Sequence, residues 1–330
     1  MKLIDAIGEW PSRPVVPLMG YPGIAAMANS AQRVLKDRDV HIESLMFLEE
    51  RYHPPCLFHV MDLTAEAEAL GLPVRFSEDG PPSITEHPVG TLERLGSLSV
   101  PDPSRDGRLP IFVDVVARTA RRIGGLMGAY CVGPFTLAAE LCGAEEFAVR
   151  TITDVGFVED MLSFVTLVCQ TYSRALASAG ARLVAILEPT AVILSPASFE
   201  KYCLEPLKSI ASSIRDGGGF PVLHICGDTT PLLATMAATG VDGLSLDGPV
   251  DLEDALAAVP DNMMVIGNVD PVAMMLEGSP ADVKEAAVSL LGKFGGRRNY
   301  LLGTGCDLPM ETPLENIDAL MEAATAFGEG

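Results

Sequence analysis

Three residues, His224, Cys226 and Cys306, carry the side chains that bind a borderline-soft metal ion. His224 and Cys226 lie two positions apart, and in an extended chain residues at that spacing point to the same side. Cys306 follows much later, so it can join them only where the fold brings two distant segments together. One nitrogen and two sulfur ligands suit zinc. They leave one coordination position open, which is typical of catalytic rather than structural zinc sites.

The spacing alone also permits a simpler interpretation. A His-x-Cys pair arises by chance, and a single cysteine at the end of a strand is commonly a small buried apolar residue. The chain has no compact array of paired Cys-x₂-Cys motifs that would indicate a structural zinc site. For the remaining cysteines, which lie within apolar segments, the sequence predicts packing in the core: Cys56, Cys131, Cys142, Cys169 and Cys203.

Four further polar residues directly follow short apolar segments and are candidates for the same site. Glu188 could be a fourth zinc ligand, could accept a hydrogen bond from His224, or could be a solvated carboxylate. Asp247 and Asp270 either line a pocket or cap the helices that follow them. We take Glu188 and Asp247 as candidate catalytic residues, and Asn268 and Asp270 as candidate cofactor-binding residues.

Eight apolar segments must position these residues: 15–19, 56–61, 126–132, 183–187, 221–225, 243–246, 264–266 and 300–302. Most lack polar–apolar alternation, as expected of strands buried on both faces, and a helical pattern follows most of them. Repeated strand–helix units predict a parallel sheet, and this many in one chain favour a closed (β/α)₈ barrel. In that fold the residues after the strands converge at one end, where reactive groups lie.

One region interrupts this pattern. Residues 73–110 are rich in proline and glycine and show little periodicity, which predicts a long excursion with short strands, such as a hairpin over the mouth of the barrel. It could be a lid or an inert surface excursion. We therefore predict a single domain over residues 1–330, with an N-terminal extension and this excursion.

Composition excludes several classes of protein. The chain has 330 residues, 48% of them hydrophobic, and 23 Lys and Arg against 44 Asp and Glu, a net charge of −21. It is therefore a core-forming protein that lacks the basic face needed for nucleic acid or an anionic membrane. The start does not resemble a signal peptide, and the seven cysteines do not form a disulfide framework, so we expect a cytoplasmic protein with reduced thiols.

At the residues above, the chain resembles the uroporphyrinogen decarboxylase superfamily and, within it, the corrinoid-dependent methyltransferases, including the methylcobamide:coenzyme M methyltransferases. The resemblance is carried by segments 133–136, 240–247, 267–271, 303–309 and 312–316. The methyltransferases have a His-x-Cys motif and a distant Cys as zinc ligands, which here falls on His224, Cys226 and Cys306. The decarboxylases instead have an Arg-rich N-terminal segment that binds the substrate carboxylates, and the corresponding residues 18–24 contain no Arg.

The resemblance implies zinc-activated attack of a thiolate on the methyl group of a methylcorrinoid, which a separate corrinoid protein carries. The acceptor would be a thiol such as coenzyme M, with tetrahydrofolate as an alternative. Two other hypotheses remain: the protein is a metal-free lyase of the decarboxylase type, or it is a non-enzymatic barrel with structural zinc. A sulfonate acceptor would need one or two arginines near the mouth, and Arg182, Arg215 and Arg297–Arg298 cannot be placed from sequence. A homodimer is compatible with the sequence.

Overall fold

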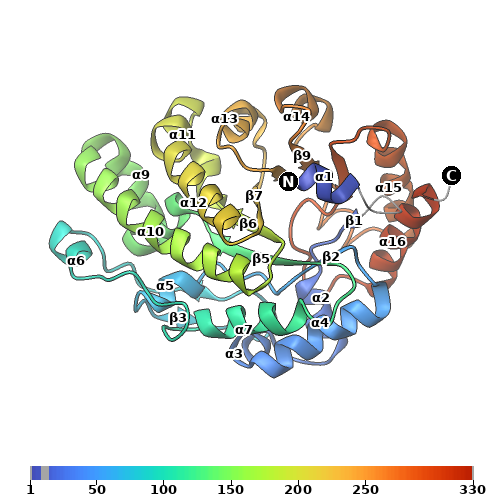
Figure 1. The fold of residues 1–330 in the computed structure, drawn as a ribbon, viewed down its shortest axis with the longest axis horizontal. Coiled ribbons are helices and arrows are strands. Elements are labelled where there is room, and N and C mark those ends of the chain that lie inside the picture. Colours follow the sequence, from blue (N-terminus) through green and yellow to red (C-terminus); the bar gives the residue numbers. More distant parts are fainter. Residues whose placement is uncertain (1, 9–14, 329–330) are drawn as a thin grey trace.

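The computed structural model describes residues 2–8 and 15–328. Its central sheet has eight parallel strands in the order β1-β10-β9-β8-β7-β6-β5-β2 (Figure 1). They are β1 (Val15–Val16), β2 (Cys56–Phe58), β5 (Leu126–Val132), β6 (Leu183–Leu187), β7 (Phe220–Ile225), β8 (Gly243–Leu246), β9 (Met264–Ile266) and β10 (Tyr300–Gly303). The strands at the two ends of this order, β1 and β2, contact each other, so the sheet is a nearly closed barrel. The predicted (β/α)₈ fold is confirmed, and each predicted segment contains one strand.

Helices surround the barrel (Figure 1). Those that begin before β6 are α1 (Leu3–Gly8), α2 (Gly20–Ala26), α3 (Ala31–Lys36), α4 (Arg38–Tyr52), α5 (Ala65–Ala69), α6 (Leu92–Gly96), α7 (Leu109–Thr119), α8 (Pro134–Cys142), α9 (Ala144–Thr153) and α10 (Val155–Ala179). Those that follow are α11 (Pro196–Tyr202), α12 (Leu204–Asp216), α13 (Leu233–Ala238), α14 (Leu252–Ala258), α15 (Pro280–Phe294) and α16 (Leu314–Gly328). None of the helices described is both long and apolar enough to cross a bilayer.

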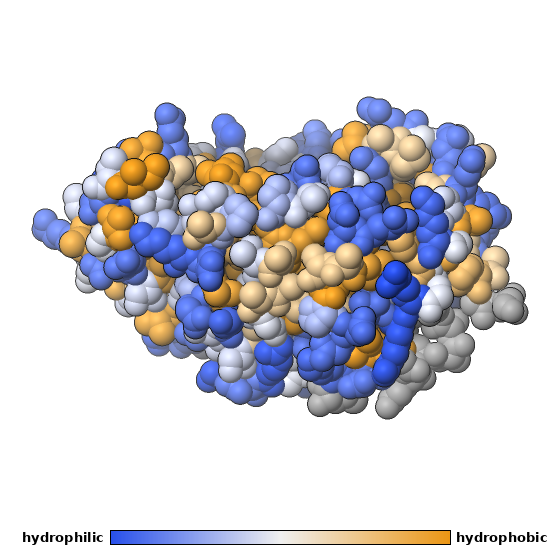
Figure 2. All heavy atoms as spheres, turned by 90° about the horizontal axis from the view of Figure 1, so that it is seen from above, coloured by the Kyte–Doolittle hydropathy of each residue, from blue (hydrophilic) through white to orange (hydrophobic). Residues whose placement is uncertain are grey.

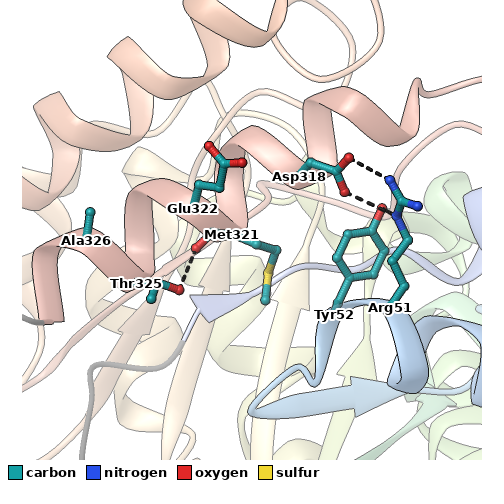
Figure 3. Close-up of a pocket in the computed structure, with 7 residues that line it drawn as sticks. All are labelled: Arg51, Tyr52, Asp318, Met321, Glu322, Thr325 and Ala326. Atoms are coloured by element: carbon teal, nitrogen blue, oxygen red, sulfur yellow. Dashed lines mark hydrogen bonds and ion pairs between the residues drawn. The ribbon is translucent and has the colours of Figure 1, made fainter.

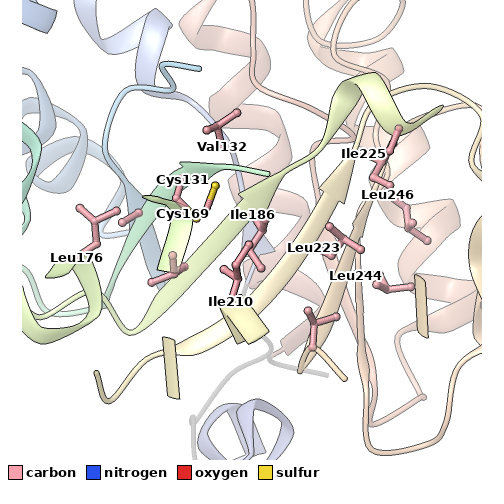
Figure 4. Close-up of a cluster of buried hydrophobic side chains, with 14 of the residues drawn as sticks. Cys131, Val132, Cys169, Leu176, Ile186, Ile210, Leu223, Ile225, Leu244 and Leu246 are labelled. Carbon is pink, nitrogen blue, oxygen red and sulfur yellow. The ribbon is translucent and has the colours of Figure 1, made fainter. Parts of the chain in front are cut away.

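The strands are apolar on both faces because each face contacts a different core. In β6, Leu183, Ala185 and Leu187 belong to the cluster inside the barrel, whereas Val184 and Ile186 belong to the cluster between sheet and helices. Figure 4 shows the second cluster, in which strand side chains pack with Cys169 and Leu176 of α10 and with Ile210 of α12. This double burial explains why the strand segments show no alternation in sequence.

The five cysteines predicted to pack in the core are buried, as expected: Cys56, Cys131, Cys142, Cys169 and Cys203. Cys226 and Cys306, by contrast, are partly exposed. On the face shown in Figure 2, hydrophobic residues appear in separate groups among hydrophilic ones. Packing in the core therefore accounts for five of the seven cysteines and leaves Cys226 and Cys306 to be explained by another role.

The excursion after α5 contains the expected hairpin, with β3 (Val74–Arg75) antiparallel to β4 (Ser83–Ile84). Its tip, residues 79–82, lines a cavity that also contacts Cys226 and Cys306. The excursion ends at α7, which begins at Leu109; Pro110 occupies its first turn and needs no amide partner there.

Candidate metal centre

His224, Cys226 and Cys306 meet at the carboxyl end of the barrel. His224 Nε2 lies 3.2 Å from Cys226 Sγ and 3.4 Å from Cys306 Sγ, and the two sulfurs are 3.5 Å apart. Within the described part of the chain, no other group of three or more His, Cys, Asp or Glu side chains could hold a metal ion. Tetrahedral zinc with ordinary bond lengths separates such ligand atoms by roughly 3.5–3.8 Å. The donor set therefore fits zinc with only a small expansion.

The hydrogen bonds of His224 leave Nε2 available as a ligand. Nδ1 lies 3.2 Å from the Ser245 carbonyl oxygen and 3.1 Å from Ser245 Oγ. A carbonyl oxygen can only accept, so the proton belongs on Nδ1 and the lone pair of Nε2 faces the two sulfurs. Burial acts to lower the pKa of His224, but the contact with Cys306 and the nearby Asp247 carboxylate outweigh it, and the pKa is raised.

The two thiols influence each other strongly. The hydrogen bond from Cys306 lowers the pKa of Cys226, whereas the same bond and burial raise the pKa of Cys306. Two thiolates this close repel each other, so the metal-free pair resists losing both protons. A bound dication would remove that repulsion and favour deprotonation of both sulfurs. The chemistry of the pair thus fits a cation between them.

Asp247 positions the loops around the three donors. Its Oδ2 accepts a hydrogen bond from the Gly227 amide at 2.7 Å, and its Oδ1 accepts one from the Gly248 amide at 2.7 Å. Gly227 follows Cys226 and has a positive φ of 85° that favours glycine. The loop after β10 packs tightly against the loop after β8. A Cβ on Gly305 would lie only 2.7 Å from the Gly248 nitrogen.

Glu188 lies at the end of β6 and is fully buried. Its Oε2 accepts a hydrogen bond from the Phe135 amide at 3.0 Å and its Oε1 one from the Thr136 amide at 2.5 Å, in the first turn of α8. Burial raises the pKa of Glu188 to about 7. Glu188 is not part of the cluster of possible metal ligands, although its amide donates a hydrogen bond to the His224 carbonyl oxygen at 2.9 Å.

Asn268 and Asp270 lie after β9, and their side chains bond to nearby backbone. The Asn268 amide donates to the carbonyl oxygens of Asp247 and Val250 at 3.0 and 2.7 Å. Asp270 accepts hydrogen bonds from the Val272 and Ala273 amides at 2.8 and 2.7 Å. These bonds shape the rim of the barrel, and binding of a corrinoid by either residue stays a prediction.

A cavity of about 500 Å³ opens onto the two sulfurs. Tyr21 at the start of α2, Met61 and Leu63 after β2, and residues 307–311 after β10 form its walls with the hairpin tip. Both carboxylate oxygens of Asp307 are buried without a hydrogen-bond partner, and burial raises the pKa of this group well above its usual range. The sequence analysis did not identify Tyr21 as a residue of the cavity wall. Tyr21 lies within residues 18–24, a segment considered there only because it contains no arginine.

A second surface pocket lies between α4 and α16 (Figure 3). Its arginine, Arg51, donates hydrogen bonds to both oxygens of Asp318 at 3.2 and 2.6 Å, and Arg51 Nε also lies 3.0 Å from the Tyr52 hydroxyl. Three polar side chains of this pocket, Arg51, Tyr52 and Asp318, are thus joined by hydrogen bonds. Their role is to join the two helices, and the cavity beside Cys226 and Cys306 is the better candidate for a reaction site.

The fold and this donor set define a (β/α)₈ barrel with metal-binding side chains at the carboxyl ends of its strands. The family model of uroporphyrinogen decarboxylase (URO-D) matches residues 18–327, and the chain therefore belongs to that family. It is 33% identical over 272 residues to the methylcobamide:CoM methyltransferase MtbA of Methanosarcina acetivorans, covering 81% of this chain and 78% of that protein. It is 29% identical to the uroporphyrinogen decarboxylase of Carboxydothermus hydrogenoformans, covering 79% and 75%.

Among solved structures, a methyltransferase from Methanosarcina mazei matches with a TM-score of 0.87 at 26% identity, covering 96% of this chain and 94% of that one. The predicted relationship to the methyltransferases of the family is confirmed, and these relatives support methyltransferase activity.

Proposed function

We propose that this protein is a zinc-dependent methyltransferase that moves a methyl group between a protein-bound methylcorrinoid and a thiol acceptor. The single observation that carries the proposal is the convergence of His224, Cys226 and Cys306, with both sulfurs on the wall of a cavity. Relatives named as methylcobamide:CoM methyltransferases support the corrinoid donor and a thiol acceptor such as coenzyme M.

The donor residues would hold zinc through His224 Nε2 and the sulfurs of Cys226 and Cys306. Zinc, when bound, would supply Lewis acidity that keeps an acceptor thiol deprotonated and nucleophilic at neutral pH. Because the chain supplies three ligands and both sulfurs line the cavity, a thiol in the cavity would be able to reach the metal as a fourth ligand. A cytoplasmic location would keep both sulfurs reduced.

The surrounding residues position the donors. Ser245 orients the imidazole of His224, and Asp247 holds the loop that follows Cys226 through the Gly227 amide. Glu188 fixes the start of α8 against the end of β6. We propose Glu188 and Asp247 as positioning residues, whose loss would weaken metal binding.

The test measures zinc content and methyl transfer together. Purified protein should contain one zinc per chain, and it should demethylate methylcobalamin when a thiol is added, which the colour change of cobalt reports. Cys226→Ser should lose both the zinc and the activity, because serine is a poor zinc ligand. Cys142→Ser removes a buried thiol outside the site and should retain both properties.

Two outcomes would contradict the proposal. Full methyl transfer by Cys226→Ser, with zinc absent, would separate the reaction from the metal. Bound zinc whose coordination does not change when a thiol is added would favour a structural role. Transfer to tetrahydrofolate but to no thiol would replace the acceptor and keep the methyltransferase class.

A further inference from the structure

We infer that the acceptor is a thiol whose far end is uncharged or positively charged, and that the site discriminates against thiols with an anionic end. The inference rests on the proposed function, because it takes the cavity beside Cys226 and Cys306 as the place where the thiol binds. It departs from the coenzyme M that the named relatives use, which carries a sulfonate.

The walls of the cavity are apolar and its charged residues are acidic. Met61, Leu63, Leu308 and Met310 supply apolar surface. Apart from the two cysteines, Tyr21 and the buried carboxyl of Asp307, the ionisable groups on the wall are Asp79 and Glu311. Neither lysine nor arginine is among the described residues that line it. A sulfonate or carboxylate in protein requires a cation or several donated hydrogen bonds, and these walls provide acidic groups instead.

One cation that acts on this wall, Arg108, is already neutralised. Arg108 acts electrostatically on Tyr21, a lining residue, but its guanidinium is buried. It forms ion pairs with Asp62 and Glu68, and its Nη2 donates to Thr64 Oγ1 at 3.0 Å. Two carboxylates outweigh one guanidinium, so this group contributes no net positive charge toward the cavity.

The other arginines considered for a sulfonate lie at the opposite end of the barrel. Arg182 precedes β6 and donates to the Gly218 carbonyl oxygen at 2.7 Å. Arg215 at the end of α12 pairs with Asp242, which precedes β8, and Arg298 precedes β10 and pairs with Asp5. Since the metal donors lie at the carboxyl ends of their strands, the length of the barrel separates these cations from the cavity.

The overall charge acts in the same direction. A net charge of −21 produces a negative potential that lowers the local concentration of small anions. The apolar lining favours an acceptor with an apolar body, and Asp79 and Glu311 favour a cationic end over an anionic one.

The experiment uses cobalt(II)-substituted protein, in which binding of a thiolate to the metal produces new absorption bands. Three thiols share a two-carbon spacer and a tetrahedral end: 2-mercaptoethanesulfonate, 3,3-dimethylbutane-1-thiol and thiocholine. Their ends are anionic, neutral and cationic, and none chelates the metal through its end. We expect the sulfonate to bind at least about tenfold more weakly than the other two. The order of kcat/KM with zinc protein and methylcobalamin should be the same.

Glu311→Lys tests the origin of the preference, because it places a cation on the cavity wall and should shift the ratio toward the sulfonate. Glu159→Lys makes the same charge change on the exposed surface of α10 and should leave the ratio unchanged. Equal binding of the three thiols, or tighter binding of the sulfonate, would overturn the inference and leave the proposed function intact. Failure of the protein to bind cobalt or zinc would overturn the proposed function itself, and the inference with it.

Discussion

The two ends of the barrel differ in how their polar groups are paired. At the amino end, Arg215 pairs with the buried Asp242, Arg298 pairs with Asp5, and α1 contributes Leu3 and Ile4 to the inner core. At the carboxyl end, two partly exposed sulfurs lie 3.5 Å apart and the Asp307 oxygens have no hydrogen-bond partner. Paired groups stabilise a fold, whereas unpaired ones are retained at a cost in stability. The difference therefore separates the stabilising end from the reactive end.

The largest expected effect concerns the reactivity of the thiols. In metal-free protein, the hydrogen bond from Cys306 lowers the pKa of Cys226, so at neutral pH Cys226 is more fully a thiolate than an ordinary cysteine. Burial raises the pKa of Cys131 and Cys169 well above the usual value and also blocks access. Iodoacetamide should therefore alkylate Cys226 roughly 100-fold faster than either buried cysteine, as peptide mass spectrometry over time would show.

The lowered pKa of Cys226 also predicts how its alkylation depends on pH. Because the thiolate is the reactive form, alkylation of Cys226 should slow as the pH falls through its lowered pKa, and zinc should protect it wherever the metal stays bound. Equal labelling of all seven cysteines in folded protein would show that the two ends do not differ as described.

A smaller effect is expected where the two loops of the carboxyl end meet. Gly305→Ala places a Cβ 2.7 Å from the Gly248 nitrogen, so the loop that carries Cys306 must shift away from the loop after β8. We expect roughly tenfold weaker zinc binding, measured by competition with a chelator, since the ligand geometry is disturbed while all three ligands remain. Gly296→Ala, where the added Cβ meets no atom within 4 Å, is the matched control. Unchanged zinc affinity in Gly305→Ala would mean that the loop tolerates the shift.

The smallest effect should come from the amino end and should change stability alone. Arg215→Met removes the hydrogen bonds to the Gly240 carbonyl oxygen and to Asp242, leaving a buried carboxylate without its partner. The free energy of unfolding should fall by about 1 kcal/mol, because the guanidinium is partly exposed and only part of the pairing energy is lost. Zinc content should not change.

Arg174→Met, which breaks an exposed pair with Asp216, should cost less than about 0.5 kcal/mol. Urea unfolding curves of both variants give the comparison. A loss of zinc in Arg215→Met would show that the two ends of the barrel are coupled.

Much of the architecture could be predicted from local patterns. Strands such as β6 and β7 are apolar on both faces, and this pattern persists in the chain whatever the tertiary contacts. The ends of strands were less predictable where backbone hydrogen bonds, and not the hydropathy of the side chains, determine them. The segment predicted at 15–19 forms only the short strand Val15–Val16, because Leu18 donates its amide to Thr304 Oγ1 instead of to a strand partner.

The candidate site was predictable in its ligands and much less so in its surroundings. The residue types and spacing of His224, Cys226 and Cys306 indicated a metal before any geometry was available. The polar groups chosen with them, Glu188 and Asn268, prove to hold backbone amides and carbonyls, which a residue type cannot reveal.

The amino-acid sequence by itself determined the order of strands and helices and the identity of the three donor side chains, since hydropathy and ligand chemistry are properties of the residues. Only the tertiary structure decided that Cys306 meets His224 and Cys226, that Arg182, Arg215 and Arg298 lie at the amino end, and that acidic and apolar walls border the sulfurs. These are relations between segments distant in the chain, and they arise only when the parallel strands close into a barrel and align their carboxyl ends.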